Sequence, residues 1–274
     1  MDTNIFEEAY QKILNTNNIA QRLHEICPYR EQCWGDLLPK EKDALIWNDI
    51  SLPYIGSKFS GKLLCVGINF NGTGGLNAAS ELITGKEGVK KSLANQNKKM
   101  RFGNTPKRYS GTQLFHNLAV YANVLLGNTH LEGDELLSVN NKNIYDDFDV
   151  LSSVWDELIY LNAVKCSPDP FDKNTERSKP TEIMKMLCPK NILQEEIKLI
   201  SPDNILILSV DIYNSLRTIF TERTEAISEG RVCEQTITVN EKQIKLFCVP
   251  HPSAFGGNSR KIGTDLAKVF EKSI

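Results

Sequence analysis

The sequence lacks any apolar run approaching the about 20 residues that a helix needs to cross a lipid bilayer. It also lacks a secretory signal, because its first residues, MDTNIFEEAYQKIL, are amphipathic and acidic where a signal begins basic and continues apolar. Internal repeats and low-complexity linkers are absent as well. These absences favour a cytoplasmic protein with a single domain over residues 1–274 and no membrane partner. The sequence carries no signal for an oligomeric state, and a monomer is the expectation.

A strong excess of charge of either sign is missing too, since the net charge is only −2. A polycation of the histone type is therefore excluded, and any contact with nucleic acid must come from a local cluster of Lys and Arg. One cluster lies in a basic insertion over residues 76–108. From position 86 to position 108, eight basic residues accompany the single acid Glu87: Lys86, Lys90, Lys91, Lys98, Lys99, Arg101, Lys107 and Arg108. Counterion release would favour phosphate binding there. A solvated insertion without a ligand is the alternative.

Short apolar and β-branched runs alternate with amphipathic segments along the chain. Strands are predicted over 62–70, 159–166 and 204–210, with a hairpin over 235–253. Helices are predicted at an N-terminal extension over 1–26 and over 111–126, 181–200, 211–220 and 263–274, with Thr181 as an N-cap and Pro189 as a break or kink. Residues 27–61 and 132–149 are expected to be loops. The alternation predicts an α/β fold, a three-layer αβα arrangement around a mainly parallel sheet.

The predicted strands end in polar sequences that fall where such a sheet places its ligand site, beyond the carboxyl ends of its strands. VGINFNGTGG at 66–75, YLNAVKCSP at 160–168 and VPHPSAFGG at 249–257 occur in this order, with SGTQLFHNLA and ISPDNILILSVDIYNSL between them. Together they resemble the uracil-DNA glycosylase superfamily over about residues 27–270. They are closest to its iron–sulfur-type members, with a GIN loop similar to that of mismatch-specific and single-strand-selective glycosylases.

The resemblance implies an enzyme that flips a base out of DNA and hydrolyses its N-glycosidic bond. It assigns Asn69 to the attacking water and His251 to the carbonyl oxygen of the departing base, where negative charge develops. Asn162 matches the residue that reads the pyrimidine edge, because an amide offers a donor and an acceptor together. Phe70 and Tyr109 are the candidates for stacking on the base. The family's Pro–Gly is replaced here by Phe70–Asn71.

Several residues are expected to bind the DNA backbone. Ser253 lies in the second catalytic loop of the resemblance and would bind a phosphate. The remaining candidates are basic: Lys98, Lys99, Arg101 and Arg260. The expected partner is DNA, single- or double-stranded.

Seven cysteines in a chain of cytoplasmic type point to metal binding or buried thiols before disulfides. The resemblance implies a structural [4Fe–4S] cluster with four ligands: Cys27, Cys33, Cys166 and Cys188. Five residues separate the first two, where the family has a C-x-x-C pair, and the same thiolates would also suit Zn²⁺. Cys65 and Cys248 fall in apolar strands and are expected in the core, and Cys233 has no evident role.

The resulting hypothesis is a monofunctional glycosylase of base excision repair, which releases uracil or another modified pyrimidine and leaves an abasic site. No Lys lies in a motif position to form a Schiff base. Two alternatives stay open: a glycosylase that acts on hypermodified bases of phage DNA in defence, and an inactive relative that only binds DNA. A nucleotide-binding protein is disfavoured because GTGG at 72–75 is a poor version of the glycine-rich fingerprint.

Overall fold

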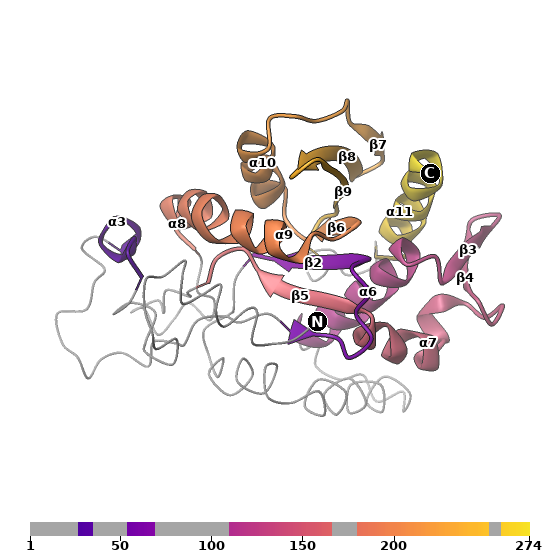
Figure 1. Cartoon of the computed structure of the whole chain (residues 1–274). Coiled ribbons are helices and arrows are strands. Elements are labelled where there is room, and N and C mark those ends of the chain that lie inside the picture. The colour runs from indigo at the N-terminus through magenta and orange to yellow at the C-terminus, as the bar shows by residue number, and fades with distance from the viewer. Residues whose placement is uncertain (1–26, 35–53, 69–109, 166–179, 252–258) are drawn as a thin grey trace, which may run out of the picture.

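A computed structural model describes residues 27–34, 54–68, 110–165, 180–251 and 259–274 (Figure 1). Within them a seven-stranded sheet has the order β1-β5-β2-β6-β9-β8-β7. Its strands are β1 (Tyr54–Ile55), β2 (Leu63–Gly67), β5 (Leu158–Asn162), β6 (Asn204–Ile207), β7 (Ile227–Glu229), β8 (Val232–Val239) and β9 (Lys242–Cys248). The central strands β5, β2, β6 and β9 are parallel, while β1, β8 and β7 pair antiparallel to their neighbours. The mixed α/β class predicted from the sequence is confirmed.

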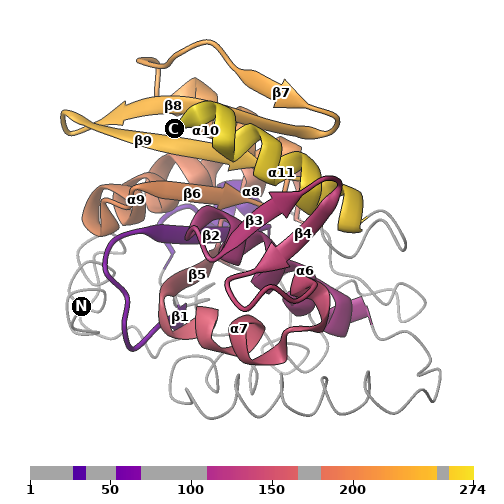
Figure 2. The same ribbon diagram turned by 90° about the vertical axis from the view of Figure 1, so that its right-hand side faces the viewer.

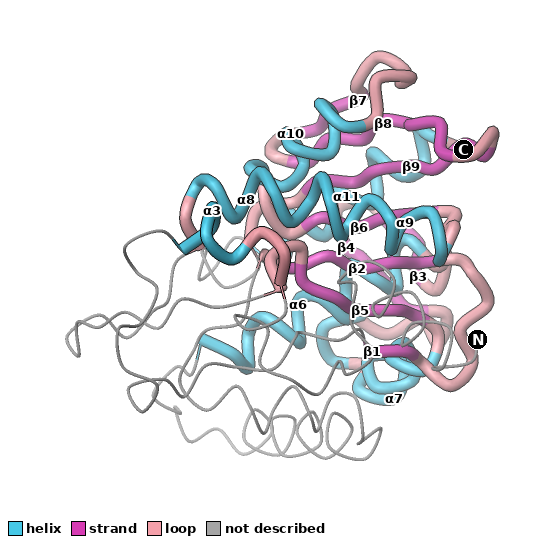
Figure 3. Tube along the Cα trace, turned by 60° about the vertical axis from the view of Figure 1, so that its left-hand side comes forward, coloured by secondary structure: helices cyan, strands magenta, loops and turns pink. Residues whose placement is uncertain are grey.

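Helices cover both faces of this sheet. One face is packed by α8 (Glu182–Cys188), a π-helical turn (Pro189–Leu193), α9 (Gln194–Ile200) and α10 (Val210–Ile219), as Figure 3 shows. The other face is packed by α6 (Ser110–Leu125), α7 (Phe148–Ser153) and α11 (Ser259–Ser273), which lie in front in Figure 2. The short α3 (Arg30–Trp34) lies against α8.

The alternation of side chains along the central strands produces these two cores. In β2, Leu64 and Val66 pack with the α8–α10 layer, while Leu63 and Cys65 pack with α6 and α11. All five residues of β2 are buried, as expected for a central parallel strand covered on both faces. Cys248 is buried too, which confirms the core assignment of both strand cysteines.

The helix signals in the sequence have their expected effect. The Thr181 hydroxyl accepts a hydrogen bond from the Met184 amide at the start of α8. Pro189 has no amide hydrogen to donate, and the helix widens there into the π turn before continuing as α9. Ser209 caps α10 directly after β6. None of the described helices has the length and apolar character to cross a bilayer.

Two predicted loops contain regular structure, and these predictions were wrong. Residues 27–61 include α3 and β1. Residues 132–149 include most of a hairpin, β3 (Thr129–Glu132) with β4 (Glu135–Ser138), a 3₁₀ turn (Ile144–Asp146) and the start of α7. The hairpin turn contains Gly133 at φ 62°, and Asp147 caps α7 by accepting from the Val150 amide. Both signals are local and were present in the sequence. A second 3₁₀ turn (Val154–Asp156) connects α7 to β5.

Candidate active site at the carboxyl edge of the sheet

The parallel strands all end at one common edge of the sheet. In chain order β2, β5, β6 and β9 are the first to fourth parallel strands, and in space they follow the order second, first, third, fourth. The chain passes from β2 to β5 on one side of it, and then crosses to β6 and β9 on the other side. The direction of the connections therefore reverses between β2 and β6, which is the switch point of the sheet. At this edge lie Gly67 at the end of β2 with Ile68 after it, Asn162 at the end of β5, and His251 after β9.

Asn162 is held tightly at the end of β5. Its side chain is buried, and the Tyr160 hydroxyl donates to its Oδ1 over 3.3 Å. Beyond the strand the pairing continues, because the Ala163 and Val164 amides donate to the carbonyls of Gly67 and Ile68 over 2.9 and 2.8 Å. The residue that precedes Asn69 is therefore hydrogen-bonded to the segment that follows Asn162.

Gly67 permits this close approach of β2 and the Asn162 side chain. A Cβ at Gly67 would lie 2.4 Å from the Tyr160 hydroxyl oxygen and 2.6 Å from Asn162 Oδ1. Both distances are shorter than atoms of these types can adopt, so any larger residue would displace the pair. Glycine at this position thus allows an oriented amide to sit beside the end of β2.

His251 lies on the other side of the switch point. Its strand is fixed up to Val249, whose amide donates to the Ile207 carbonyl over 3.0 Å, and the His251 side chain is partly exposed. Strands β2 and β6 lie between β5, which ends at Asn162, and β9, which precedes His251, so three strand spacings, about 14 Å, separate the backbones of β5 and β9. Asn162 and His251 therefore border the switch point from opposite sides.

A second polar group forms where α6 and α11 meet, and it joins the predicted Arg260 to two residues that the sequence did not single out, His116 and Tyr145. The Arg260 guanidinium carbon lies 5.2 Å from the centre of the Tyr145 ring, and the His116 ring lies 6.0 Å from the same ring. The Tyr145 hydroxyl donates to the Ser259 carbonyl over 2.9 Å and so fixes the first residue of α11. His116 stands in the SGTQLFHNLA motif, which was the available signal.

The environment of His116 favours its neutral form. Burial lowers the pKa of its imidazole, the Arg260 charge lowers it further, and Asp146 opposes them only in part. Arg260 itself is exposed. A neutral imidazole and an exposed guanidinium here offer hydrogen bonding and a positive charge.

Three of the four predicted cluster cysteines share one neighbourhood. Cys27, Cys33 and Cys188 are buried in the core between α3 and α8. Burial raises the pKa of the Cys33 thiol to about 12, and the nearby thiols of Cys188 and Cys27 raise it as well. The part of the chain that the structure describes contains no group of three or more His, Cys, Asp or Glu side chains placed to hold a metal. It therefore brings these thiols near one another without forming a complete ligand set.

A buried ion pair connects this region to the end of β5. Lys165 Nζ lies 2.7 Å from Glu196 Oε1 on α9, and both side chains are almost fully buried. Burial lowers the pKa of Lys165, while the thiol of Cys188 raises it, and burial raises the pKa of Glu196. Lys165 directly precedes Cys166 in the chain, so the pair fixes the strand end where the fourth predicted ligand follows.

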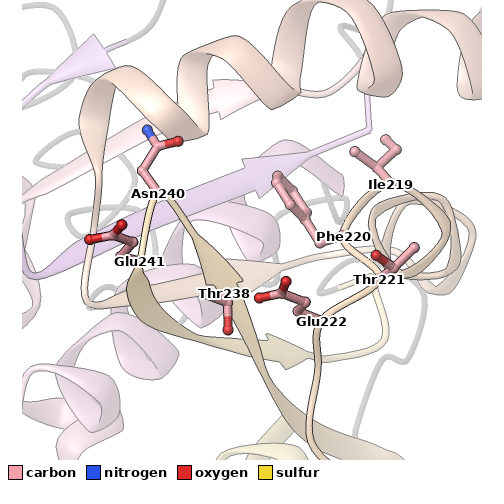
Figure 4. Close-up of a pocket in the computed structure, with 7 residues that line it drawn as sticks. All are labelled: Ile219, Phe220, Thr221, Glu222, Thr238, Asn240 and Glu241. Atoms are coloured by element: carbon pink, nitrogen blue, oxygen red, sulfur yellow. The ribbon is translucent and has the colours of Figure 1, made fainter.

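A surface pocket of about 350 Å³ lies at the opposite edge of the sheet, at the β8–β9 turn and the end of α10 (Figure 4). Its lining includes the carboxylates of Glu222 and Glu241 and no basic residue. Negative charge repels phosphate, so this pocket does not suit DNA. None of the predicted site residues lines it.

Several predicted site residues lie outside the described part of the chain. They comprise the candidates for water positioning, base stacking, phosphate binding and the fourth thiol: Asn69, Phe70, Tyr109, Ser253, Lys98, Lys99, Arg101 and Cys166. The 1–26 extension and the 76–108 insertion lie outside it as well.

Comparison of the sequence with known proteins adds no assignment. Neither the scan against protein-family models nor the search of curated proteins finds a match to this chain.

Proposed function

We propose that the chain is a monofunctional DNA glycosylase with a uracil-DNA glycosylase-like fold. The observation that supports it most is the meeting of three motif strands at one edge, with Asn162 and His251 on opposite sides of the switch point. A flipped nucleotide needs to be held from two sides while the bond between its sugar and base breaks.

In this proposal the leaving base is bound by two side chains. Asn162 hydrogen-bonds the Watson–Crick edge of the pyrimidine, and its orientation is fixed in advance by Tyr160. His251 donates to the base oxygen that gains negative charge as the bond lengthens. Asn69 orients the water that attacks the sugar, two residues beyond the strand end at Gly67.

In this proposal the DNA backbone is bound beside the carboxyl edge of the sheet. Arg260 lies exposed at the start of α11, and Ser253 belongs to the segment between His251 and that helix. Lys98, Lys99 and Arg101 of the basic insertion add positive charge. These contacts position the duplex or single strand without reading its sequence.

The proposal includes a structural [4Fe–4S] cluster bound by Cys27, Cys33, Cys166 and Cys188. Its support is the common neighbourhood of the three described thiols, which come from two distant segments. The cluster would tie residues 27–34 to α8, and it takes no part in hydrolysis, which transfers no electrons. Iron, sulfide and zinc analysis of protein purified without oxygen tests this part. About four irons and four sulfides per chain support the cluster, and stoichiometric zinc contradicts it.

The activity is tested by mass spectrometry of free bases released from a panel of oligonucleotides. The panel contains uracil, thymine mismatches, and hydroxymethylated or glucosylated cytosine, in single and double strands. Release of one of these bases is expected from the unmodified chain and should be lost in Asn69→Ala while DNA binding persists. Binding without release from any substrate would contradict the enzyme and support a DNA-binding relative.

A further inference from the structure

Two cysteines that the proposed function does not use face each other across β8 and β9. Cys233 and Cys248 are direct partners in the antiparallel register. Direct partners in such a ladder have Cα atoms about 4.5–5.5 Å apart, within the about 4.4–6.8 Å that a disulfide spans. Cys248 is buried, whereas Cys233 is partly exposed. The inner thiol is thus shielded and the outer one can be reached from solvent.

Helix α10 presents two polar groups to this pair. The Tyr213 hydroxyl is buried and has no hydrogen bond of ordinary geometry within the described residues, although it lies close enough to interact with the Cys233 thiol. The Arg217 guanidinium lies 5.5 Å from the Tyr213 ring centre, and its Nε is also buried without a partner in the described part of the chain. Two donors without acceptors beside a thiol form a site suited to an anion.

These neighbours act on the two thiols in opposite directions. The hydrogen bond with Cys248 lowers the pKa of Cys233, and Tyr213 and Arg217 lower it further against the effect of burial and of Glu234. The pKa of Cys248 is raised by the same hydrogen bond and by burial. Cys233 is therefore the thiol that ionises first, and its thiolate is the reactive form.

We propose that Cys233 is a peroxide-reactive thiol that closes a reversible disulfide with Cys248. The Cys233 thiolate attacks the terminal oxygen of a hydroperoxide, the O–O bond breaks, and the OH group is transferred to the sulfur. The leaving alkoxide takes up the proton that the thiol released on ionisation and departs as an alcohol, or as water in the case of hydrogen peroxide. Cys233 becomes a sulfenic acid, to which Tyr213 and Arg217 donate. The Cys248 sulfur then attacks the Cys233 sulfur, the S–O bond breaks, and the oxygen leaves as water with the Cys248 proton. The dithiol loses two electrons and the peroxide gains them.

The disulfide would lie close in the chain to a residue of the proposed active site. Cys248 is the last residue of β9, three residues before His251, so the disulfide would form at the carboxyl edge of the sheet. Thiols of a reducing cytoplasm would reopen it. The inference does not depend on the glycosylase activity, because it rests on β8, β9 and α10 alone.

The test treats the reduced full chain with hydrogen peroxide, blocks remaining thiols with N-ethylmaleimide and maps tryptic peptides. The expected product joins peptide 232–242 to peptide 246–260, with a mass two hydrogens below their sum. In Cys248→Ser, the Cys233 sulfenic acid should persist and be trapped by dimedone. Cys65 is the internal control, because it is fully buried and burial raises the pKa of its thiol. Cys233 should react at least about ten times faster than Cys65.

Variants of α10 test whether Tyr213 and Arg217 promote the reaction of Cys233 or merely lie near it. Tyr213→Phe and Arg217→Met should each slow oxidation of Cys233 by about 3- to 10-fold and shift its alkylation profile to higher pH. Asn214→Ala, an exposed change on the same helix, is the matched control. The proposal is overturned if the joined peptide does not form, or if Cys233 reacts no faster than Cys65. Base release measured on the same samples reports separately on the proposed function.

Discussion

The two edges of the central sheet differ in how their polar groups are used. At the amino edge, short connections satisfy one another: the Asp203 amide donates to the Gly61 carbonyl, the Asn204 amide to the Lys62 carbonyl, and Lys242 forms an ion pair with Asp203 at 2.8 Å. At the carboxyl edge, Asn162 and His251 lie around the switch point. One edge is therefore closed by contacts within the fold, while the other carries polar side chains that the proposed function assigns to ligand binding.

The largest difference between variants at the two edges is expected in the rate of base release. Asn162→Ala should lower the rate of base release by at least about 100-fold, because a fixed donor and acceptor to the base would be lost. Glu222→Gln, in the pocket at the amino edge, should leave the rate unchanged. Single-turnover assays with the substrate identified by the base panel measure both. Equal effects of the two variants would remove the functional difference between the edges.

The next effect concerns stability at the carboxyl edge. Glu196→Ala should lower the free energy of unfolding by about 3 kcal/mol, because Lys165 would stay buried without its partner. The exposed pair Lys198–Glu195 on the same helix gives the control, and Glu195→Ala should cost less than about 1 kcal/mol. Urea unfolding followed by circular dichroism measures both. A loss for Glu196→Ala as small as that of the control would mean that the buried pair does not hold the strand end.

A smaller effect is expected at Gly67. Gly67→Ala should lower the free energy of unfolding by about 1–3 kcal/mol and reduce base release, since its Cβ would displace Tyr160 and Asn162. Tyr160→Phe in the same chain removes the nearer oxygen and should restore part of the stability. If the losses in free energy of unfolding from Gly67→Ala and Tyr160→Phe simply add in the double variant, the close approach of β2 and β5 is not the cause of the destabilisation by Gly67→Ala.

The smallest effect lies at the amino edge. Asn240 and Glu241 form the two-residue turn between β8 and β9 with φ values of 48° and 67°, and the second position of such a turn favours glycine. Glu241→Gly should raise the free energy of unfolding by about 0.5–1 kcal/mol without changing base release. Glu241→Ala keeps the positive-φ strain and should give no gain. Thermal unfolding distinguishes the two.

The sequence predicted the parts of the fold that repeat a simple pattern over many residues. Buried strands such as Leu63–Gly67, and the carboxyl edge where they end, follow from apolar runs and their order. The β3–β4 hairpin was missed because its strands are short and partly exposed, so only the Gly133–Asp134 turn signalled them. Helix α7 was missed for the same reason, as it has six residues and one capping signal at Asp147.

For the candidate site, the sequence predicted which residues lie at the carboxyl edge, but not which side chains surround them. Motif order gave Asn162 and His251, but the close approach of Gly67 to the Asn162 side chain depends on the register of β5 with β2. His116 was missed because its partner Tyr145 is distant in sequence and meets it only through helix packing. Cys233 and Cys248 are opposed only in the folded hairpin, since spacing alone does not fix which residues of two strands pair.

The ion pair between Lys165 and Glu196 also constrains how this chain can diverge. Replacing either residue alone removes the opposite charge from its buried partner, whereas replacing both with apolar side chains of similar volume costs little. Descendants of this fold should therefore exchange the two positions in concert, retaining Lys with Glu or substituting both. Correlated change between a strand end and the middle of a distant helix would be its evolutionary trace.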